Sequence, residues 1–393
     1  MSEFRVNSIT NQDGSAGPQV CGVSTFSGKS GVQIPSGSSD FRRQDGGGRG
    51  RGIFDSGGSP SSTNVIDMIE IATKGNATDF GDDLHSRQEG NAAFASATRG
   101  VMAGGLTPTI LTSISYVTIS SQGGANDFGD LITAVARNVG LSNNIRGISG
   151  GGTETNAAPQ TNVMEFLTIA STGDGTNFGD LTRKHAGQGA CASPTRGLFA
   201  GGYNPDGNAK NIDFITIATL GDAQDFGELT DDVNHLAGCS NSTRGLFGGG
   251  QNPSNVNTIA FVTIATLGNA QDFGDLSVPR YAVASLSSTT RAITGGGYDA
   301  TTYYNIIEYV TIQTLGDATD FGDLTTLTGH PGAVSNSIRG VFGGGYISPA
   351  DANTNVMEFI TIASTGNSQD FGDLLSAIRQ PTGISDSHGG IGE

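Results

Sequence analysis

A unit of about 48 residues repeats seven times along this chain, and the repeat constrains the fold more than any other feature. Each unit holds an Asp-Phe-Gly-Asp motif or a close variant, and its phenylalanines are Phe80, Phe128, Phe178, Phe226, Phe273, Phe321 and Phe371. An arginine series runs at the same period: Arg51, Arg99, Arg146, Arg196, Arg244, Arg291 and Arg339. Such periods are typical of propellers with four strands per blade, so the sequence predicts an all-β, seven-bladed β-propeller.

The turn-forming residues around Phe273 predict where the four strands of a blade begin and end. Residues 259–266 and 270–276 are predicted as third and fourth strands, followed by 282–288 and 291–297 as first and second strands. Glycine followed by Asn or Asp separates the third and fourth strands in six of the seven units. Because glycine suits the first central position of a type II′ turn, we predict a two-residue hairpin there.

The first strand of each unit carries one larger residue between small ones. The larger residues are Phe94, Leu141, Cys191, Cys239, Leu286, Val334 and Ile384, and their neighbours are nearly all Ala, Ser or Gly. Small side chains fit the crowded strand nearest a propeller axis. The register therefore predicts that Cys191 and Cys239 are buried structural thiols rather than reactive ones.

The two ends of the repeat array predict how the ring closes. The chain enters the first unit at a second strand, residues 51–58, and leaves the last at a first strand, residues 382–387. One blade is therefore expected to combine strands from both termini, which removes an exposed edge. We predict a propeller at 51–389, a short tail at 390–393, and a Gly/Ser-rich segment at 1–50 that attaches to a partner by adding strands.

Composition excludes several classes of function. A net charge of −17 disfavours nucleic acid as a partner, and no apolar stretch is long enough for membrane insertion. The Asp-Phe-Gly motif lacks the lysine and His-Arg-Asp segments of kinases, and the five histidines lie at different repeat offsets without ligand spacing. We therefore predict a non-enzyme with no catalytic residue, metal or cofactor.

The aspartates beside each phenylalanine leave two alternatives open. Pairs such as Asp320 and Asp323 could bind calcium, although one pair supplies too few oxygens. The favoured alternative is that they cap turns and pair with the arginine series.

Strand direction gives the predicted disc two unlike faces. Short, uniform turns join first to second and third to fourth strands on one face, whereas the loops on the other face differ between units. Six tyrosines lie in or beside these variable loops and are the candidate binding residues: Tyr203, Tyr281, Tyr298, Tyr303, Tyr304 and Tyr346. Tyr116 and Tyr309 occupy an aromatic core position instead. Loops on a rigid scaffold commonly carry recognition, although variable loops can also be mere solvated connections.

Two resemblances come from these motifs. An apolar pair followed by glycines and a tyrosine, together with Val278-Pro279-Arg280, resembles the kelch repeat, with Phe where kelch units usually carry Trp. The phrase "TRGxFGGG…ITIATxGNAxDFGDL" and the N-terminal "FRVNSITNQDGSAGPQV" are similar to virion structural and tail-fibre-like proteins of marine cyanobacterial phages. That resemblance implies a virion protein. Because the start "MSEFRVNSIT" does not resemble a secretory signal, we expect synthesis in the host cytoplasm, followed by display in multiple copies on the extracellular particle.

The expected function is therefore host recognition on a phage tail or tail fibre, with the variable loops binding a surface glycan or protein. In this interpretation residues 1–50 bind other virion proteins. One alternative is a capsid decoration, collar or other accessory protein whose propeller mediates assembly. A second is a host-encoded kelch-type interaction module.

Overall fold

The computed structural model describes residues 25–27, 31–33, 50–58, 63–88, 91–155, 159–350 and 352–387. The chain divides into two units, Met1–Gly48 and Arg49–Glu393. In the first unit, β1 (Thr25–Ser27) pairs antiparallel with β2 (Gly31–Gln33). The remainder of the predicted attachment segment, and the predicted tail at 390–393, lie outside the described residues.

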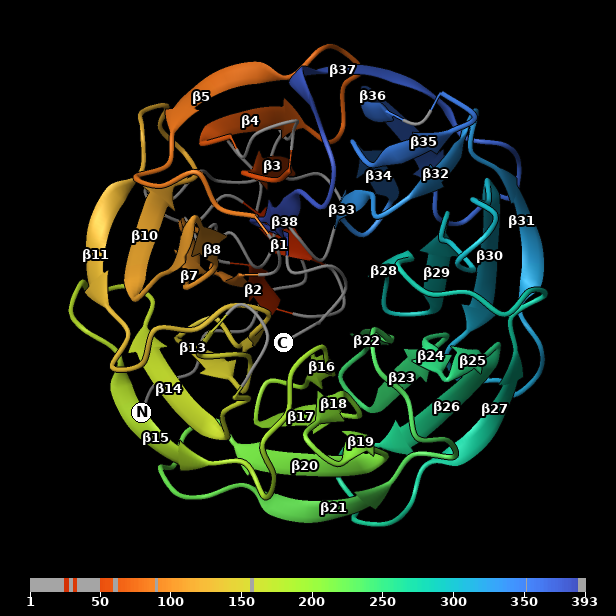
Figure 1. Cartoon of the computed structure of the whole chain (residues 1–393). Helices are drawn as coiled ribbons and strands as arrows, with labels where there is room; N and C mark the ends of the chain where they lie inside the picture. Colours follow the sequence, from red (N-terminus) through yellow and green to blue (C-terminus); the bar gives the residue numbers. More distant parts are fainter. Residues whose placement is uncertain are drawn as a thin grey trace, which may run out of the picture. The chain divides into compact units, whose positions relative to one another are not determined.

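Seven antiparallel blades of four strands form a closed ring, which confirms the predicted seven-bladed β-propeller (Figure 1). The described residues contain no helix. From the axis outwards, blade 1 consists of β38 (Thr382–Ser385), β3 (Arg51–Asp55), β4 (Val65–Glu70) and β5 (Thr78–Asp82); blade 2 of β6 (Ala92–Ala95), β7 (Arg99–Ala103), β10 (Ser113–Thr118) and β11 (Asn126–Asp130); blade 3 of β12 (Val139–Ser142), β13 (Arg146–Gly150), β14 (Val163–Thr168) and β15 (Thr176–Asp180); and blade 4 of β16 (Gly189–Ala192), β17 (Arg196–Ala200), β20 (Asn211–Thr216) and β21 (Gln224–Glu228).

The same order continues around the ring. Blade 5 consists of β22 (Ala237–Ser240), β23 (Arg244–Gly248), β26 (Thr258–Thr263) and β27 (Gln271–Asp275); blade 6 of β28 (Ala284–Ser287), β29 (Arg291–Gly295), β30 (Ile306–Thr311) and β31 (Thr319–Asp323); and blade 7 of β33 (Gly332–Ser335), β34 (Arg339–Gly343), β36 (Ala352–Thr361) and β37 (Gln369–Ile378). The strands predicted around Phe273 correspond to β26, β27, β28 and β29, each one or more residues shorter than predicted.

Short extra strands occupy the variable loops and were not predicted. They are β8 (Leu106–Thr107) with β9 (Thr109–Ile110), β18 (Tyr203–Asn204) with β19 (Gly207–Asn208), β24 (Gln251–Asn252) with β25 (Ser254–Asn255), and β32 (Leu327–Gly329) with β35 (Tyr346–Ser348). These pairings show that the backbones of these loop segments are hydrogen-bonded to one another.

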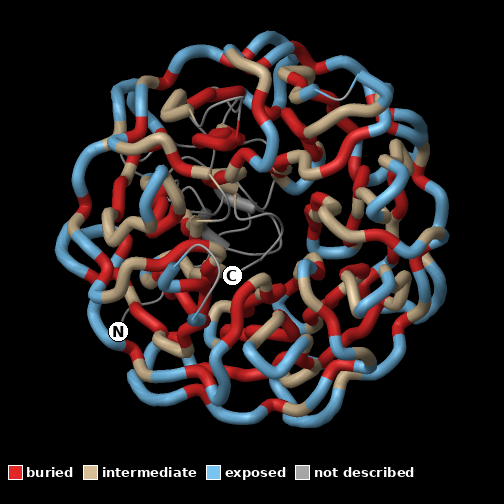
Figure 2. Tube along the Cα trace, in the orientation of Figure 1, coloured by how far each residue is buried: buried red, intermediate tan, exposed pale blue. Residues whose placement is uncertain are grey.

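The core lies between the blades. Third strands such as β26 bury both faces, whereas the outermost strands bury little besides the motif phenylalanine (Figure 2). In blade 5 the Phe273 ring meets the Phe261 ring edge to face at 5.7 Å, and the same pairing recurs in every blade except blade 1, where Met68 replaces the third-strand aromatic. Tyr116 and Tyr309 take part in these pairs, which confirms their predicted core position.

Strands from the two ends of the propeller close the ring, and they reproduce there the contacts of the turn that joins first and second strands in the other blades. In the other six blades, the residue three before the arginine donates its backbone N–H to the arginine carbonyl and caps the arginine N–H with its own side chain. In blade 1, Asp386 does both for Arg51: its N–H donates to the Arg51 carbonyl, and its Oδ1 accepts the Arg51 N–H at 3.0 Å. The predicted closure by strands from both termini is confirmed.

The glycine between the third and fourth strands connects neighbouring blades, so the predicted type II′ hairpin is wrong. Seven residues separate β26 from β27, and Gly268 donates its N–H to the carbonyl of Phe226 in the preceding blade at 2.8 Å. The Asn269 side chain accepts the N–H of Glu228 in the same preceding strand. The backbone bond recurs between all seven pairs of blades, including Gly75 to Phe371 across the closure.

The motif glycine is required by the same contact. Gly274 has φ +142°, and a Cβ there would overlap the backbone of Gly316 in the next blade. Asp272 caps the Gly274 N–H with its carboxylate; an aspartate does so in five of the seven blades, and the Asn177 side chain does so in blade 3. The predicted turn-capping role of the motif aspartates is confirmed.

The arginine series also joins neighbouring blades, but it does not pair with the aspartates as predicted. The Arg244 guanidinium donates to the Ile312 carbonyl in the next blade at 2.9 Å and lies 4.7 Å from the centre of the Phe261 ring. The bond to the next blade recurs for all seven arginines. A planar guanidinium can stack on the ring and still donate at its edge, which explains why arginine occupies this position.

Buried carboxylates supply a third set of contacts between blades. Five third strands carry one. Glu165, Asp213, Glu308 and Glu358 each accept an N–H from the linker that follows the preceding blade, and Asp67 accepts one from Leu375 within β37. Burial raises the pKa of Asp67 to about 6 and also raises the pKa of Glu165 and Asp213.

We predict that deleting residues 380–393 destabilises the whole ring. The deletion removes β38, its buried Ile384 and the Asp386 turn, and leaves the inner edge of β3 unpaired. Thermal unfolding followed by circular dichroism should show a strongly lowered Tm or no folded protein. Deletion of 388–393 is the control and should leave Tm unchanged; equal Tm values for both truncations would contradict the closure described above.

Blade 2 offers a test of the contact between outer strands, because Gly124 replaces the Asn or Asp found in the other six units. The Asp82 N–H therefore lacks the side-chain acceptor that its counterparts have. Gly124→Asn should raise the free energy of unfolding by about 1 kcal/mol. Gly124→Ala is the matched control, and an equal gain from alanine would show that the amide oxygen is not responsible.

Candidate functional site

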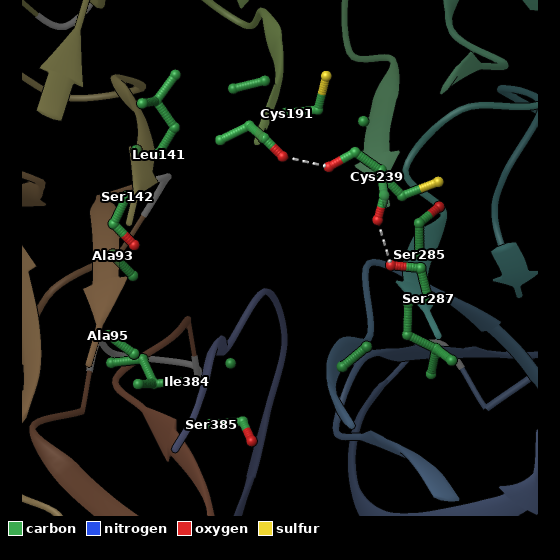
Figure 3. Close-up of a pocket in the computed structure, with 18 of the residues that line it drawn as sticks. Ala93, Ala95, Leu141, Ser142, Cys191, Cys239, Ser285, Ser287, Ile384 and Ser385 are labelled. Carbon is green, nitrogen blue, oxygen red and sulfur yellow. Dashed lines mark hydrogen bonds between the residues drawn. The ribbon is translucent and has the colours of Figure 1, made fainter. Parts of the chain in front are cut away.

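The axial channel is a cavity of about 290 Å³ lined by the first strands of all seven blades. Figure 3 shows part of this lining, with labelled residues from the first strands of blades 1 to 6. Two of the lining serines bind the neighbouring first strand: Ser240 Oγ donates to the Ala192 carbonyl and Ser287 Oγ to the Ser240 carbonyl. The prediction of small residues nearest the axis is confirmed, and none of the described residues that line the channel is charged.

Of the two cysteines at this wall, Cys191 is buried, as predicted, whereas Cys239 is half-buried. The Cys191 thiol lies against Gly245 in the next blade and belongs to the apolar core. Desolvation raises the pKa of Cys191 and raises that of Cys239 to about 12, which suppresses the reactive thiolate.

Five of the six candidate tyrosines come together on the variable face. With His235 they form a continuous row of six rings, which we call the aromatic arc: Tyr203, His235, Tyr281, Tyr298, Tyr303 and Tyr346. The centroid separations along it are 6.1, 6.3, 5.6, 4.4 and 5.6 Å, and Tyr298 and Tyr303 are stacked with an angle of 24° between their planes. The arc spans the loops of blades 4, 6 and 7 and the linkers between blades 4, 5 and 6.

Backbone contacts hold the rings in place. A Cβ at Gly329 would lie 2.7 Å from the Tyr303 ring, so this ring packs directly on the linker backbone between blades 6 and 7. A Cβ at Gly187 would likewise crowd both Tyr203 and His235. Each tyrosine is half-buried. Part of each ring is therefore exposed to solvent, while its buried part restricts side-chain rotation. The arc is therefore a preorganised contact surface.

An arginine stands at each end of the arc. The Arg137 guanidinium donates to the Tyr203 hydroxyl at 3.2 Å, and the exposed Arg379 guanidinium lies 6.0 Å from the centre of the Tyr346 ring. Arg137, His235 and His330 occupy corresponding positions in three linkers, each with φ near +55°. Nearby protein atoms and the charge of Arg137 lower the pKa of His235, although part of its ring remains solvent-exposed.

Tyr304 does not join the arc, in contrast to the prediction that grouped it with Tyr303. Its hydroxyl donates to Asp299 Oδ2 at 2.6 Å, and Thr301 and Thr302 donate to the other oxygen of the same carboxylate. These bonds lower the pKa of Asp299 and fix its charge beside the arc. Tyr304 thus holds the loop that carries Tyr303 through its hydroxyl, and among the described residues its ring pairs with no ring of the arc.

Sequence reasoning missed Arg137, His235, His330 and Arg379. A signal was available, because His235 and His330 follow their motif phenylalanines at the same offset, contrary to the expectation that the histidines occupy different ones. Tyr203, Tyr298 and Tyr346 also share an offset, directly after two glycines. The sequence shows each of these side chains at a repeat offset, but only the tertiary structure shows the order in which the rings follow one another around the face.

Within the described residues, no group of three or more His, Cys, Asp or Glu side chains is arranged to hold a metal ion. The calcium alternative for the motif aspartates therefore gains no support from side-chain geometry. No described segment forms a helix long and apolar enough to cross a membrane.

Fold and site together define a seven-bladed β-propeller with a preorganised aromatic surface on its variable face. No known protein-family model and no curated protein matches this chain. The arrangement can bind a ligand by stacking and by hydrogen bonds from tyrosine hydroxyls and arginines.

Acidification should test the environment of His330. Desolvation, His235 and Arg379 lower its pKa from 6.5 to about 4. Between these values the unfolded chain binds a proton that the folded ring does not, so the free energy of unfolding falls as the pH drops from about 6.5 to 4. The loss of unfolding free energy across this pH window should be smaller in His330→Gln than in the wild-type protein, by on the order of 2 kcal/mol. Urea unfolding at several pH values measures both losses. Parallel pH profiles for the two proteins would contradict this assignment.

Proposed function

We propose that this protein is a non-enzymatic phage virion component, displayed on the tail or tail fibre, whose aromatic arc binds a glycan or protein on the host surface. The arc carries the proposal because it combines six rings from the loops of three blades and from two linkers into one surface. Tyrosine gives large contact area at low conformational entropy cost, which suits a recognition surface. The virion assignment itself rests on the sequence resemblance.

The position of the chain ends supports outward display of the arc. Arg51 begins a second strand and Ser385 ends a first strand, so both lie on the uniform face, opposite the variable loops. Attachment through residues 1–50 to other virion proteins would then direct the arc away from the particle. Many copies on one particle would strengthen individually weak contacts.

A capsid decoration, collar or other assembly protein is the second candidate, and one feature of the uniform face favours it. Three consecutive blades expose a leucine in the connection between third and fourth strands: Leu220, Leu267 and Leu315, each more than half exposed. A row of apolar side chains suits contact with another virion protein. The same row would also serve an attached receptor-binding protein.

Location and adsorption test the two candidates. Antibody labelling of purified particles should mark the tail or fibre tips, and label over the capsid lattice would support decoration instead. Phage carrying both Tyr298→Leu and Tyr303→Leu should adsorb to host cells about tenfold more slowly, since two central rings of the arc are lost.

Tyr304→Phe is the matched control for adsorption. It removes a tyrosine hydroxyl from the same loop but leaves every ring of the arc in place. Normal adsorption by the double variant, on particles with intact protein content, would contradict host recognition by the arc.

A further inference from the structure

We propose that the aromatic arc binds an extended polysaccharide whose sugar rings are mostly uncharged and which carries occasional carboxylate or sulfate groups, one of them held at Arg379. This inference rests on the proposed function of the arc as a recognition surface and adds the chemical class of the ligand.

The row of rings matches a linear chain of sugars rather than a compact ligand. Six rings follow one another at 4.4 to 6.3 Å, crossing from the loop of blade 4 to that of blade 7. The C–H faces of sugar rings stack on aromatic faces, and tyrosine hydroxyls can bond to sugar hydroxyls. A ligand that reaches several rings must itself be extended, as a polysaccharide segment is.

The charges beside the arc predict where acidic groups are tolerated. Arg379 is exposed at one end and Arg137 is half-buried at the other, so anionic substituents are favoured at the ends. In the middle, the Asp299 carboxylate lies in the loop that carries Tyr298 and Tyr303, held by the Tyr304 hydroxyl at 2.6 Å. Desolvation, then Tyr298 and then the charge of Asp299 raise the pKa of Tyr281. A densely charged polyanion would be repelled there, whereas uncharged sugars would not.

The same pattern disfavours single-stranded nucleic acid, which also stacks on aromatic side chains. Proteins that bind it line the whole groove with positive charge, because every nucleotide carries a phosphate. Here the arginines flank the arc, its middle lies beside Asp299, and the whole chain carries a net charge of −17. A sparsely charged polysaccharide satisfies both the rings and the charges.

Calorimetric titration of the full chain with four defined probes tests the proposal. The probes are hyaluronan oligosaccharides, with alternating charged and uncharged sugars; chitin oligosaccharides of equal length, uncharged; polygalacturonate fragments, fully charged; and single-stranded oligothymidylate. Hyaluronan should bind about tenfold more tightly than chitin, since one charge-assisted contact is added at Arg379. Polygalacturonate and oligothymidylate should bind more weakly than hyaluronan.

Two variants separate the charge from the rings. Arg379→Gln should reduce hyaluronan affinity about tenfold, to that of chitin, while leaving chitin affinity unchanged. Tyr298→Leu with Tyr303→Leu should weaken both glycans more than tenfold, and Tyr304→Phe should weaken neither.

Three results would overturn the inference: no binding of either glycan by folded protein, hyaluronan affinity unaffected by Arg379→Gln, or tighter binding of oligothymidylate. If no glycan binds but host adsorption still depends on Tyr298 and Tyr303, the ligand class is wrong and the proposed recognition function stands. If host adsorption does not depend on these residues, the proposed recognition function is wrong, whether or not the glycans bind.

Discussion

The architecture depends on a backbone hydrogen bond between neighbouring outer strands, from the glycine before each fourth strand to the motif phenylalanine of the preceding blade. The bond requires the two backbones to approach so closely that the motif glycine cannot carry a side chain. The phenylalanine therefore anchors each blade in two ways. Its ring packs on the third strand of its own blade and into the core shared with the next blade, and its carbonyl accepts a hydrogen bond from that next blade.

Two further contacts repeat with the same period and act at other radii of the disc. Arginine bonds connect second strands to the end of the next third strand, and buried carboxylates connect third strands to the preceding linker. A repeat unit cannot bury its apolar faces alone, so stability comes from neighbours. Closing the ring supplies a neighbour to the first and last blades, and Asp386 completes that closure as a substitute turn.

Because these repeated contacts between blades hold the scaffold together, the loops on the variable face can differ from blade to blade. The tyrosines of the arc come from loops and linkers that differ between blades, yet Gly329 and Gly187 seat their rings against fixed backbone. Recognition surfaces benefit from such preorganisation because less entropy is lost on binding. The functional interpretation therefore follows from the difference between the two faces. One face has uniform turns, and the other has variable loops that carry the aromatic arc.

The sequence alone determined the number of blades, the strand order and the closure, because the Phe and Arg periods count the units and the small residues of the first strands mark the axis. It also placed the candidate tyrosines on one face. It could not reveal that Gly268 bonds to another blade or that Arg244 reaches Ile312, since both partners lie about one or more repeats away. Only the tertiary structure separated Tyr304 from Tyr303, added His235 to the arc and placed Arg137 and Arg379 at its ends. Side-chain neighbours across blades depend on how the ring brings distant loops together.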